Sequence, residues 1–451
     1  MIYRKIDSFL DAYYEKLNKK ALLITGARQI GKTYSVREFA KRKFKHFVEI
    51  NFIESPEAKK IFEGASNAED VLLRLSSFVR NPVVPGSTLI FLDEVQECPE
   101  AVTLIKFLVQ EGSYKYVLSG SLLGVELKDL RSEPVGYMDV KKMYPIDIEE
   151  FALSLGVSED VIENLRQCYN HREPVDDFVH SRMMAMFRLY LVIGGMPAAV
   201  STYLKTNNIK EVAAEHQAIL NLYKRDIAKY DPQNKLYLNE IFDLIPSELN
   251  AKNKRFIMKS LNQNMKFSRY ENSFLWLKDA GVALPTYNVE EPRTPLLLAK
   301  QRNLFKLFLC DTGLLTSQFG SGVYLQMLQG DNAINFGSVY ENVAAQEFVA
   351  HGYNLYYFNS KKQGELDFVI EDGNGKVLPI EIKSGKDYDR HNALSNVMKT
   401  KEYALSEAFV FCNDNIKIVN KTIYYPIYML MFLQIPELED VVFPFDMTGL
   451  K

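Results

Sequence analysis

Apolar positions in the first 150 residues alternate between short continuous runs and stretches with helical spacing. Four runs are each long enough for one buried strand: ALLITG (21–26), HFVEIN (46–51), TLIFLDE (88–94) and KYVLSG (115–120). Continuous runs of this length are typical of parallel strands covered by helices on both faces. The pattern therefore predicts a doubly wound parallel α/β sheet for residues 1–150, with an amphipathic helix inside residues 1–20.

The apolar pattern changes after residue 150. Residues 151–234 lack strand-like runs and have helical spacing, broken by GGMP at 194–197, which predicts a helical, lid-like region. Residues 235–300 contain two helical stretches, a third that ends at Gly281, and then the extended segment VALPTYNV. Helices followed by a hairpin-like pair are the order of a winged helix, so residues 235–300 are predicted to form a winged-helix domain.

A third pattern covers residues 301–451. A helix is predicted at 339–352, where VYENVAAQEFVAHG ends in the glycine typical of a helix C-terminus. NLYYFNS, ELDFVIED and KVLPIEIKSG follow as consecutive strands, and DGNG at 372–375 is the expected hairpin turn between the last two. The order of elements predicts a separate C-terminal α/β domain.

The composition narrows the class of protein. Of 451 residues, 47% are hydrophobic and 25% are charged, and 54 Lys and Arg against 57 Asp and Glu give a net charge of −3. This balance excludes a wholly basic nucleic-acid coat and leaves room for a local basic patch. The four cysteines form no CxxC pair, and no run approaches the ~20 apolar residues of a membrane span. We therefore expect a reduced, cytoplasmic protein that does not enter a membrane.

Residues 26–33, GARQIGKT, match the Walker A pattern G-x-x-x-x-G-K-[ST] between an apolar strand and a helix. Gly26 and Gly31 let the backbone curl so that amide N–H groups and the following helix N-terminus face phosphate oxygens. Lys32 is expected to reach the β- and γ-phosphates, and the Thr33 hydroxyl to bind Mg²⁺. The predicted nucleotide contacts are Gly26, Ala27, Arg28, Gln29, Ile30, Gly31, Lys32, Thr33 and Tyr34. The simpler alternative is a glycine turn that binds nothing.

LIFLDE at 89–94 supplies the second half of the predicted site, a Walker B motif. Asp93 ends an apolar strand and is expected to hold Mg²⁺ through water, and Glu94 to polarise the attacking water. A glutamate directly after the Mg²⁺ aspartate is typical of hydrolysing NTPases rather than kinases. HFVEIN at 46–51, between the two motifs along the chain, can supply the intervening strand of that class. Without the phosphate loop, two acidic residues would more simply begin a solvated loop.

A serine and two arginines complete the predicted machinery. Ser119 ends the strand KYVLSG and is expected to sense the γ-phosphate, with Ser121 as the alternative, although capping of the strand end explains either serine equally well. Arg28 in the loop and Arg131 further along the chain are candidates for an arginine finger. A solvated surface arginine is the ordinary alternative.

The chain resembles a known family once its motifs are taken together: the prokaryotic AAA+ ATPases whose C-terminal part is named only as a domain of unknown function. The N-terminal motifs that carry the resemblance are GARQIGKT, FLDEVQECPE, VLSGSLLG, MYPIDIEEF, GGMPAAV and YKRDIAKY. IFDLIPSELNAKNKRF and FGSVYENVAAQEF…GELDFVIE…LPIEIKSG extend it to nearly the whole chain. The resemblance implies an AAA+ (ASCE) P-loop module, a winged helix and a restriction-endonuclease-like fold. Many relatives carry Gly-Arg or Gly-Lys where this chain has Gly136-Tyr137, which leaves the arginine finger unassigned.

A carboxylate–lysine pattern lies in the predicted C-terminal strands. Glu381 and Lys383 share one face of a strand because side chains alternate, and the DGNG hairpin can bring Asp367 alongside. With Glu341 on the preceding helix, this is the PD-(D/E)xK pattern, a candidate nuclease site whose carboxylates would bind Mg²⁺ or Mn²⁺ and position a water for phosphodiester attack. The alternatives are a solvated acidic hairpin, or a fold retained only as a binding or structural module.

The segment from Ala251 to Tyr270 contains six basic residues and no acidic one. Lys252, Lys254 and Arg255 are the predicted contacts with nucleic-acid phosphates, and a solvated helix face is the alternative.

The sequence thus predicts a Mg²⁺-dependent ATPase that couples its nucleotide state to binding or processing of DNA or RNA by a nuclease-like C-terminal domain. The alternative is a signalling switch of the STAND type, in which ATP binding toggles the protein and the C-terminal domain contacts a protein partner without cleavage. The predicted cofactors are ATP and Mg²⁺, with a second Mg²⁺ or Mn²⁺ in the C-terminal domain. Assembly into a homo-oligomer is a further expectation, because AAA+ relatives often form rings.

Overall fold

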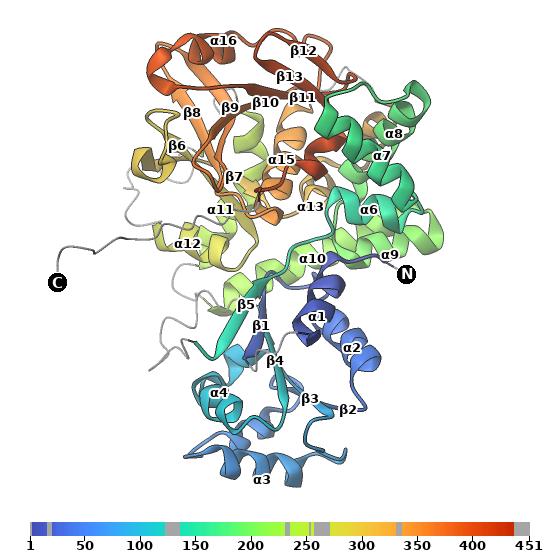
Figure 1. The fold of residues 1–451 in the computed structure, drawn as a ribbon, viewed down its shortest axis with the longest axis vertical. Coiled ribbons are helices and arrows are strands. Elements are labelled where there is room, and N and C mark those ends of the chain that lie inside the picture. Colours follow the sequence, from blue (N-terminus) through green and yellow to red (C-terminus); the bar gives the residue numbers. More distant parts are fainter. Residues whose placement is uncertain are drawn as a thin grey trace, which may run out of the picture.

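The protein has two β-sheets at opposite ends, with helices packed between and beside them (Figure 1). The computed structural model describes residues 2–15, 20–121, 136–230, 235–251, 254–256, 271–330 and 336–436. Within these ranges, no single helix is long and apolar enough to cross a bilayer. One pair, α8 (Asp177–Ile193) and α9 (Pro197–Thr206), passes that test only when its two helices, bent by 120°, are taken together.

The N-terminal sheet has five parallel strands. Their order across the sheet is β2 (His46–Asn51), β3 (Thr88–Asp93), β4 (Lys115–Gly120), β1 (Ala21–Thr25) and β5 (Met138–Lys142). The four predicted strands are confirmed. The strand between β1 and β3 in space is β4, whereas β2, predicted as the intervening strand, lies at the edge. The sequence did not indicate β5, because its residues are only partly buried or exposed and lack an apolar run.

Helices cover both faces of this sheet, as predicted. Leu22 and Ile24 of β1 face α1 (Lys5–Glu15) and α2 (Lys32–Lys43) in one apolar cluster. Ala21 and Leu23, one position out of phase, face α3 (Ala68–Phe78) and α4 (Pro99–Glu111) in another. Because both faces of β1 are buried, its sequence is continuously apolar rather than alternating.

The predicted helical region is confirmed. It contains α6 (Ile148–Ser154), α7 (Glu159–His171), α8, α9 and α10 (Ile209–Tyr230), and α11 (Lys235–Asn250) and α12 (Glu271–Asp279) follow. Close packing requires glycine at one position of the GGMP break between α8 and α9. A Cβ on Gly195 would lie 2.1 Å from the carbonyl oxygen of Ile146, which is too close for any side chain.

The C-terminal sheet has eight strands. Their order across the sheet is β12 (Lys417–Val419), β13 (Thr422–Pro426), β11 (Ala408–Cys412), β10 (Val377–Ile382), β9 (Gly364–Glu371), β8 (Tyr356–Ser360), β6 (Ala283–Val289) and β7 (Lys300–Leu309). The three predicted consecutive strands are β8, β9 and β10, and β9 and β10 form the expected hairpin. The predicted helix is α15 (Gly337–Ala350).

The hairpin predicted as a wing forms, but it belongs to this C-terminal sheet. β6 pairs with β7 in antiparallel fashion and with β8 in parallel. The sheet therefore crosses the domain boundary predicted at residue 300. The middle helix of the predicted winged helix falls largely on residues 257–270, which lie outside the described ranges.

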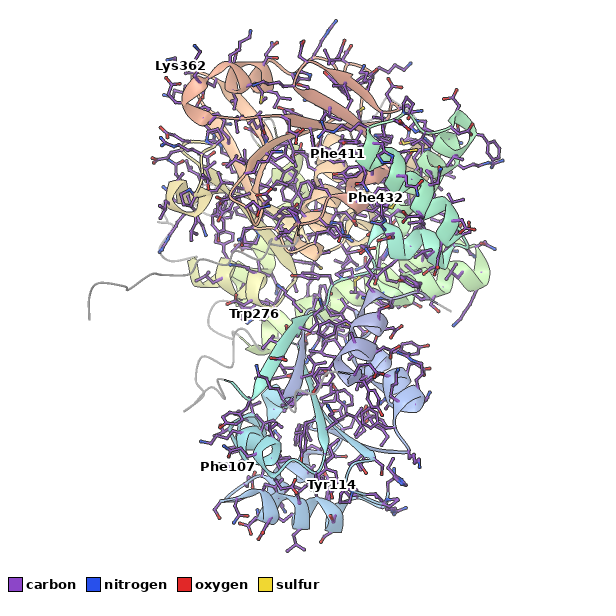
Figure 2. All side chains as sticks on the ribbon, in the orientation of Figure 1. Phe107, Tyr114, Trp276, Lys362, Phe411 and Phe432 are labelled. Carbon is purple, nitrogen blue, oxygen red and sulfur yellow. The ribbon has the colours of Figure 1, made fainter. Side chains whose placement is uncertain are left out.

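The shorter elements complete the fold. They are α13 (Thr312–Thr316), α14 (Ser321–Gln329), α16 (Asn392–Lys399) and the 3-10 helices Pro56–Ile61, Val95–Glu97, Leu296–Ala299, Ser317–Phe319, Lys401–Tyr403 and Ile427–Phe432. One apolar core runs from α1 and α2 through the helical region to the C-terminal sheet. Figure 2 shows side chains filling this continuous interior, from Trp276 in the middle to Phe411 and Phe432 near the C-terminal sheet.

Candidate active site

The phosphate loop connects β1 to α2 through three residues with positive φ. These are Gly26 at 134°, Gln29 at 66° and Gly31 at 93°. A Cβ on Gly26 would lie 2.3 Å from the carbonyl oxygen of Met143, so this position requires glycine for space as well as for conformation. Gly31 is the N-cap of α2 and supplies no side-chain cap, which leaves the first turn of the helix open toward an anion.

Lys32 begins α2 and folds back over the loop. Its Nζ donates hydrogen bonds to the carbonyl oxygens of Gly26 at 3.0 Å and Ala27 at 2.7 Å. Burial lowers the pKa of Lys32 to about 8, and the carboxylates of Glu94 and Asp93 oppose this shift only in part. Lys32 is therefore a buried ammonium held at the place where phosphate oxygens are expected.

We expect ATP affinity to fall as pH rises above about 8, the pKa of Lys32. Below this pH the ammonium is already charged, so this group adds no pH dependence. Above it, phosphate binding must return a proton to Lys32, and affinity should fall by up to about tenfold per pH unit. Titration calorimetry across this range checks the effect, with Lys32→Arg as a control that stays charged. A wild-type affinity that is constant across the range would contradict the assignment.

Asp93 lies at the end of β3, beside α2. The Thr33 hydroxyl donates to Asp93 Oδ2 at 2.9 Å, and the Ser119 hydroxyl donates to Oδ1. Burial raises the pKa of Asp93, although both hydroxyls oppose the shift. A hydroxyl and a carboxylate oxygen side by side are ligands that Mg²⁺ prefers, so Thr33 and Asp93 fit the predicted role in holding the ion of Mg²⁺–ATP.

Asn51 was not among the predicted site residues. Its Nδ2 donates to Asp93 Oδ2 at 3.1 Å. The available signal was its position as the last residue of β2, because the carboxyl ends of parallel strands meet at one edge of the sheet.

Glu94 follows Asp93 in the left-handed conformation, with a φ of 56°. Its Oε2 accepts a hydrogen bond from Gln96 Nε2 at 2.5 Å and one from the Ser121 hydroxyl at 3.4 Å. The two serines proposed as alternatives thus contact different carboxylates, Ser119 that of Asp93 and Ser121 that of Glu94. Gln96 was missed, since a glutamine two residues after Glu94 carries no recognisable pattern.

Arg28 joins the phosphate loop to the helical region. Its Nη1 lies 2.5 Å from Asp226 Oδ1 on α10, and its Nε donates to the Ser121 hydroxyl at 3.1 Å. The Tyr223 hydroxyl, one helical turn before Asp226, donates to the Arg28 carbonyl oxygen at 3.0 Å. Tyr223 and Asp226 were not predicted. The other arginine-finger candidate, Arg131, lies outside the described residues.

A cavity of about 1060 Å³ opens at the phosphate loop. One wall contains Arg28, Lys32, Thr33 and Glu94, together with the predicted contact Tyr34. The opposite wall comes from the helical region and is lined by Pro197, Ala198, Ser201, Leu204, Lys205 and Leu222. The helical region thus lines one side of the cavity at the phosphate loop, and its role as a lid stays a prediction.

The four predicted C-terminal residues Glu341, Asp367, Glu381 and Lys383 meet in one buried cluster. Lys383 Nζ lies 2.7 Å from Glu381 Oε2, and Asp367 Oδ2 accepts the Ile382 N–H at 2.9 Å. Burial, followed by the charge of Asp367, raises the pKa of Glu381 to about 8. The hairpin of β9 and β10 thus brings Asp367 and Glu381 together as expected, and Glu341 joins them from α15.

Two lysines outside the predicted pattern also enter this cluster. Lys254 Nζ contacts Glu341 Oε1, and the fully buried Lys306 lies 3.4 Å from Glu341 Oε2 and 2.9 Å from Glu365 Oε1. Glu341 and Glu381 each face a lysine, and Asp367 accepts a backbone N–H. Within the described part of the chain, no three His, Cys, Asp or Glu side chains converge as metal ligands. The structure therefore does not show the predicted second Mg²⁺ or Mn²⁺ site, which stays a prediction.

The predicted nucleic-acid contacts receive little support from this arrangement. Lys254 points into the cluster and pairs with Glu341 rather than facing solvent alone, and Arg255 is partly buried. Lys252 lies outside the described residues.

Comparison with known families supports the assignment of the N-terminal part. Residues 18–152 match the family model of an AAA domain. The N-terminal sheet with its phosphate loop thus has a P-loop NTPase fold and is similar to an AAA domain. Beyond this AAA domain, residues 184–323 match the domain of unknown function DUF8612, and residues 336–430 match the domain of unknown function DUF4143. The DUF8612 match spans the boundary predicted at residue 300, as does the sheet that contains β6 and β7.

Solved structures similar to the chain include the Walker-type ATPase PABY2304 of Pyrococcus abyssi, at 13% identity and a TM-score of 0.41, over 71% of this chain and 96% of that one. They also include the RuvB Holliday junction branch migration motor of Thermotoga maritima, at 15% identity and a TM-score of 0.28, over 68% of this chain and 92% of that one. A search of curated proteins gives no match.

Proposed function

We propose that this protein is a Mg²⁺-dependent ATPase whose AAA domain passes its nucleotide state to the helical region and the C-terminal α/β domain. The observation that carries the proposal is the packing of the phosphate loop. Arg28 pairs with Asp226 of α10, and the turn between α12 and β6 lies against the loop backbone. A Cβ on Gly281 in that turn would lie 3.1 Å from the Ala27 nitrogen.

The residues of the AAA domain divide the chemistry among them. Backbone amides of the loop and Lys32 bind the phosphates, and Thr33 and Asp93 hold the Mg²⁺ that neutralises them. Glu94 orients the water and accepts its proton as the water attacks the terminal phosphorus. Ser119, bonded to Asp93, fixes the orientation of that carboxylate.

Coupling follows from the contacts of the loop, because a loop that rearranges around phosphates must disturb what packs on it. Arg4 Nη1 donates to the Ile30 carbonyl oxygen at 3.2 Å, and Arg4 Nε lies 3.3 Å from Glu150. Close to Glu150, the Ile148 N–H donates to Glu347 on α15 at 3.0 Å. This path links the loop to the helix that also carries Glu341.

ATP hydrolysis by purified protein tests the proposal. Wild type should release phosphate in a Mg²⁺-dependent reaction, and Lys32→Ala should lose nucleotide affinity because the phosphates lose the ammonium of the loop. Lys205→Ala is a matched control: the same substitution on the α9 wall of the cavity, where it should have the smaller effect. Equal turnover by wild type and Lys32→Ala would contradict the proposal.

The partner of the C-terminal domain is a separate question, on which two predictions stand. If the protein acts on DNA or RNA, nucleic acid should raise the turnover of ATP. If it is a STAND-type switch, turnover should stay slow and should not respond. Cleavage of nucleic acid by the C-terminal cluster stays a prediction. Assembly into a homo-oligomer also stays a prediction.

A further inference from the structure

We propose that Arg28 is a phosphate sensor within the chain itself: its guanidinium binds the terminal phosphate of ATP, and Asp226 of α10 competes with this phosphate for it. The inference rests on the proposed ATPase function and deepens it. It assigns to Arg28 the discrimination between nucleoside triphosphate and diphosphate, and to α10 the response.

The position of Arg28 relative to Glu94 carries the first step. Arg28 Nε lies 3.1 Å from the Ser121 hydroxyl, which lies 3.4 Å from Glu94 Oε2. A single hydroxyl thus separates the guanidinium from the carboxylate that orients the attacking water. The water attacks the terminal phosphorus, so the guanidinium lies on the terminal-phosphate side of the cavity, which Arg28 also lines.

The second step is the competition. Arg28 Nη1 and Asp226 Oδ1 are 2.5 Å apart, and both side chains are largely buried, with exposed fractions of 17% and 11%. A carboxylate and a phosphate are alternative partners for the planar guanidinium, which forms paired hydrogen bonds with either. The Tyr223 hydroxyl holds the Arg28 carbonyl oxygen, so the side chain can change partner while the backbone stays docked on α10.

The third step follows from burial. A buried carboxylate that loses a cation is destabilised. When Arg28 turns to phosphate, Asp226 loses this partner, and a shift of α10 that exposes the carboxylate becomes favourable. α10 packs against α9, α11 and α13, so its shift reaches the rest of the helical region and the C-terminal domain. A triphosphate is therefore detected by an arginine of the phosphate loop itself, without a residue from a second subunit.

Nucleotide binding by a double-mutant cycle tests this inference. Dissociation constants for ADP and for a non-hydrolysable ATP analogue, each with Mg²⁺, are measured for wild type, Arg28→Ala, Asp226→Asn and the double variant. Arg28→Ala should raise the dissociation constant of the analogue by about tenfold or more and leave that of ADP within about twofold of wild type. The reason is that only the triphosphate has the group that Arg28 binds. Asp226→Asn should lower the dissociation constant of the analogue and leave that of ADP unchanged. The double variant should match Arg28→Ala, since Asp226 is inferred to affect the terminal phosphate through Arg28.

Several outcomes would overturn the inference. If Arg28→Ala weakens ADP and the analogue equally, Arg28 shapes the loop and does not sense the terminal phosphate. If Asp226→Asn leaves the affinity for the analogue unchanged or lowers it, Asp226 does not compete with the terminal phosphate for Arg28. Arg28→Lys keeps the charge but not the paired geometry, so its affinity for the analogue should lie between those of wild type and Arg28→Ala. It replaces Arg28→Ala in the cycle if that variant fails to fold. A wild type that binds neither nucleotide would instead refute the proposed ATPase function.

Discussion

Replacing Glu94 with glutamine is expected to reduce ATP turnover by about a hundredfold or more while nucleotide affinity stays close to that of the wild type. Glutamine keeps the size of the side chain and removes the carboxylate that accepts the proton of the attacking water. The loop, Lys32 and Asp93, which are proposed to bind Mg²⁺–ATP, are untouched. Phosphate release and equilibrium binding, measured on the same preparation, separate the two effects.

Glu97→Gln is the matched control. Glu97 ends the short helix that follows Glu94 and pairs with Lys59 at 3.4 Å. It does not line the cavity at the phosphate loop. The same change of charge at Glu97 should therefore leave turnover nearly unchanged. Unchanged turnover in Glu94→Gln would remove Glu94 from its role and would point to another group as the base.

The phosphate site was predictable because the residues of each of its motifs are neighbours in the sequence. GARQIGKT fixes a loop geometry in eight neighbours, and Asp93 and Glu94 end an apolar strand of the same sheet. Parallel strands present their carboxyl ends at one edge, so the two motifs had to meet. The partners of these residues were not predictable. Tyr223 and Asp226 reach Arg28 from a helix almost 200 residues away, and no local pattern specifies such a contact.

The C-terminal fold was predictable in its elements but not in how they combine. The period of two along β9 and β10 placed Asp367, Glu381 and Lys383 together correctly. The β6–β7 hairpin was also expected, but its order after helices suggested an independent winged helix. Pairing of β6 with β8 instead places the hairpin in the C-terminal sheet. Strand pairing depends on tertiary contacts that the order of elements does not encode. The same limit hid Lys306, which enters the cluster from β7.

The lysines of the cluster compensate the buried charges of its carboxylates, and this should have a measurable effect on the stability of the protein. Although burial disfavours its charged form, Lys306 has a raised pKa because Glu341 and Glu365 surround it. Burial, followed by the charge of Asp367, raises the pKa of Glu341 despite its two lysines. Removing Lys306 would therefore leave Glu341 with less compensation in an interior where its ionised form is costly.

We expect Lys306→Met to lower the free energy of unfolding by about 3–5 kcal/mol, the usual cost of breaking a buried ion pair. The loss should grow as pH rises. Without Lys306 the pKa of Glu341 rises further, so the folded state holds a proton that the unfolded state releases, and stability falls with increasing pH above the ordinary glutamate range. Denaturant unfolding at mildly acidic and mildly alkaline pH measures both effects. Lys376→Met is the matched control, because Lys376 pairs with Glu407 at 2.6 Å but is 46% exposed, and it should cost no more than about 1 kcal/mol.

Thermal unfolding with and without Mn²⁺ decides between lysines and a metal ion as the charges that hold the cluster together. If lysines do so, Mn²⁺ should leave the melting temperature of nucleotide-free Lys32→Ala protein unchanged, since a ligand stabilises only where it binds. A Mn²⁺-dependent rise that Asp367→Ala abolishes would show that the carboxylates take an ion after all, and would restore the nuclease prediction. A pH-independent loss in Lys306→Met would mean that Lys306 acts through packing alone. The cluster is thus either a metal-independent ion network that joins β7, α15, β9 and β10, or a metal site that displaces its lysines, and the two differ in whether Mn²⁺ raises the melting temperature.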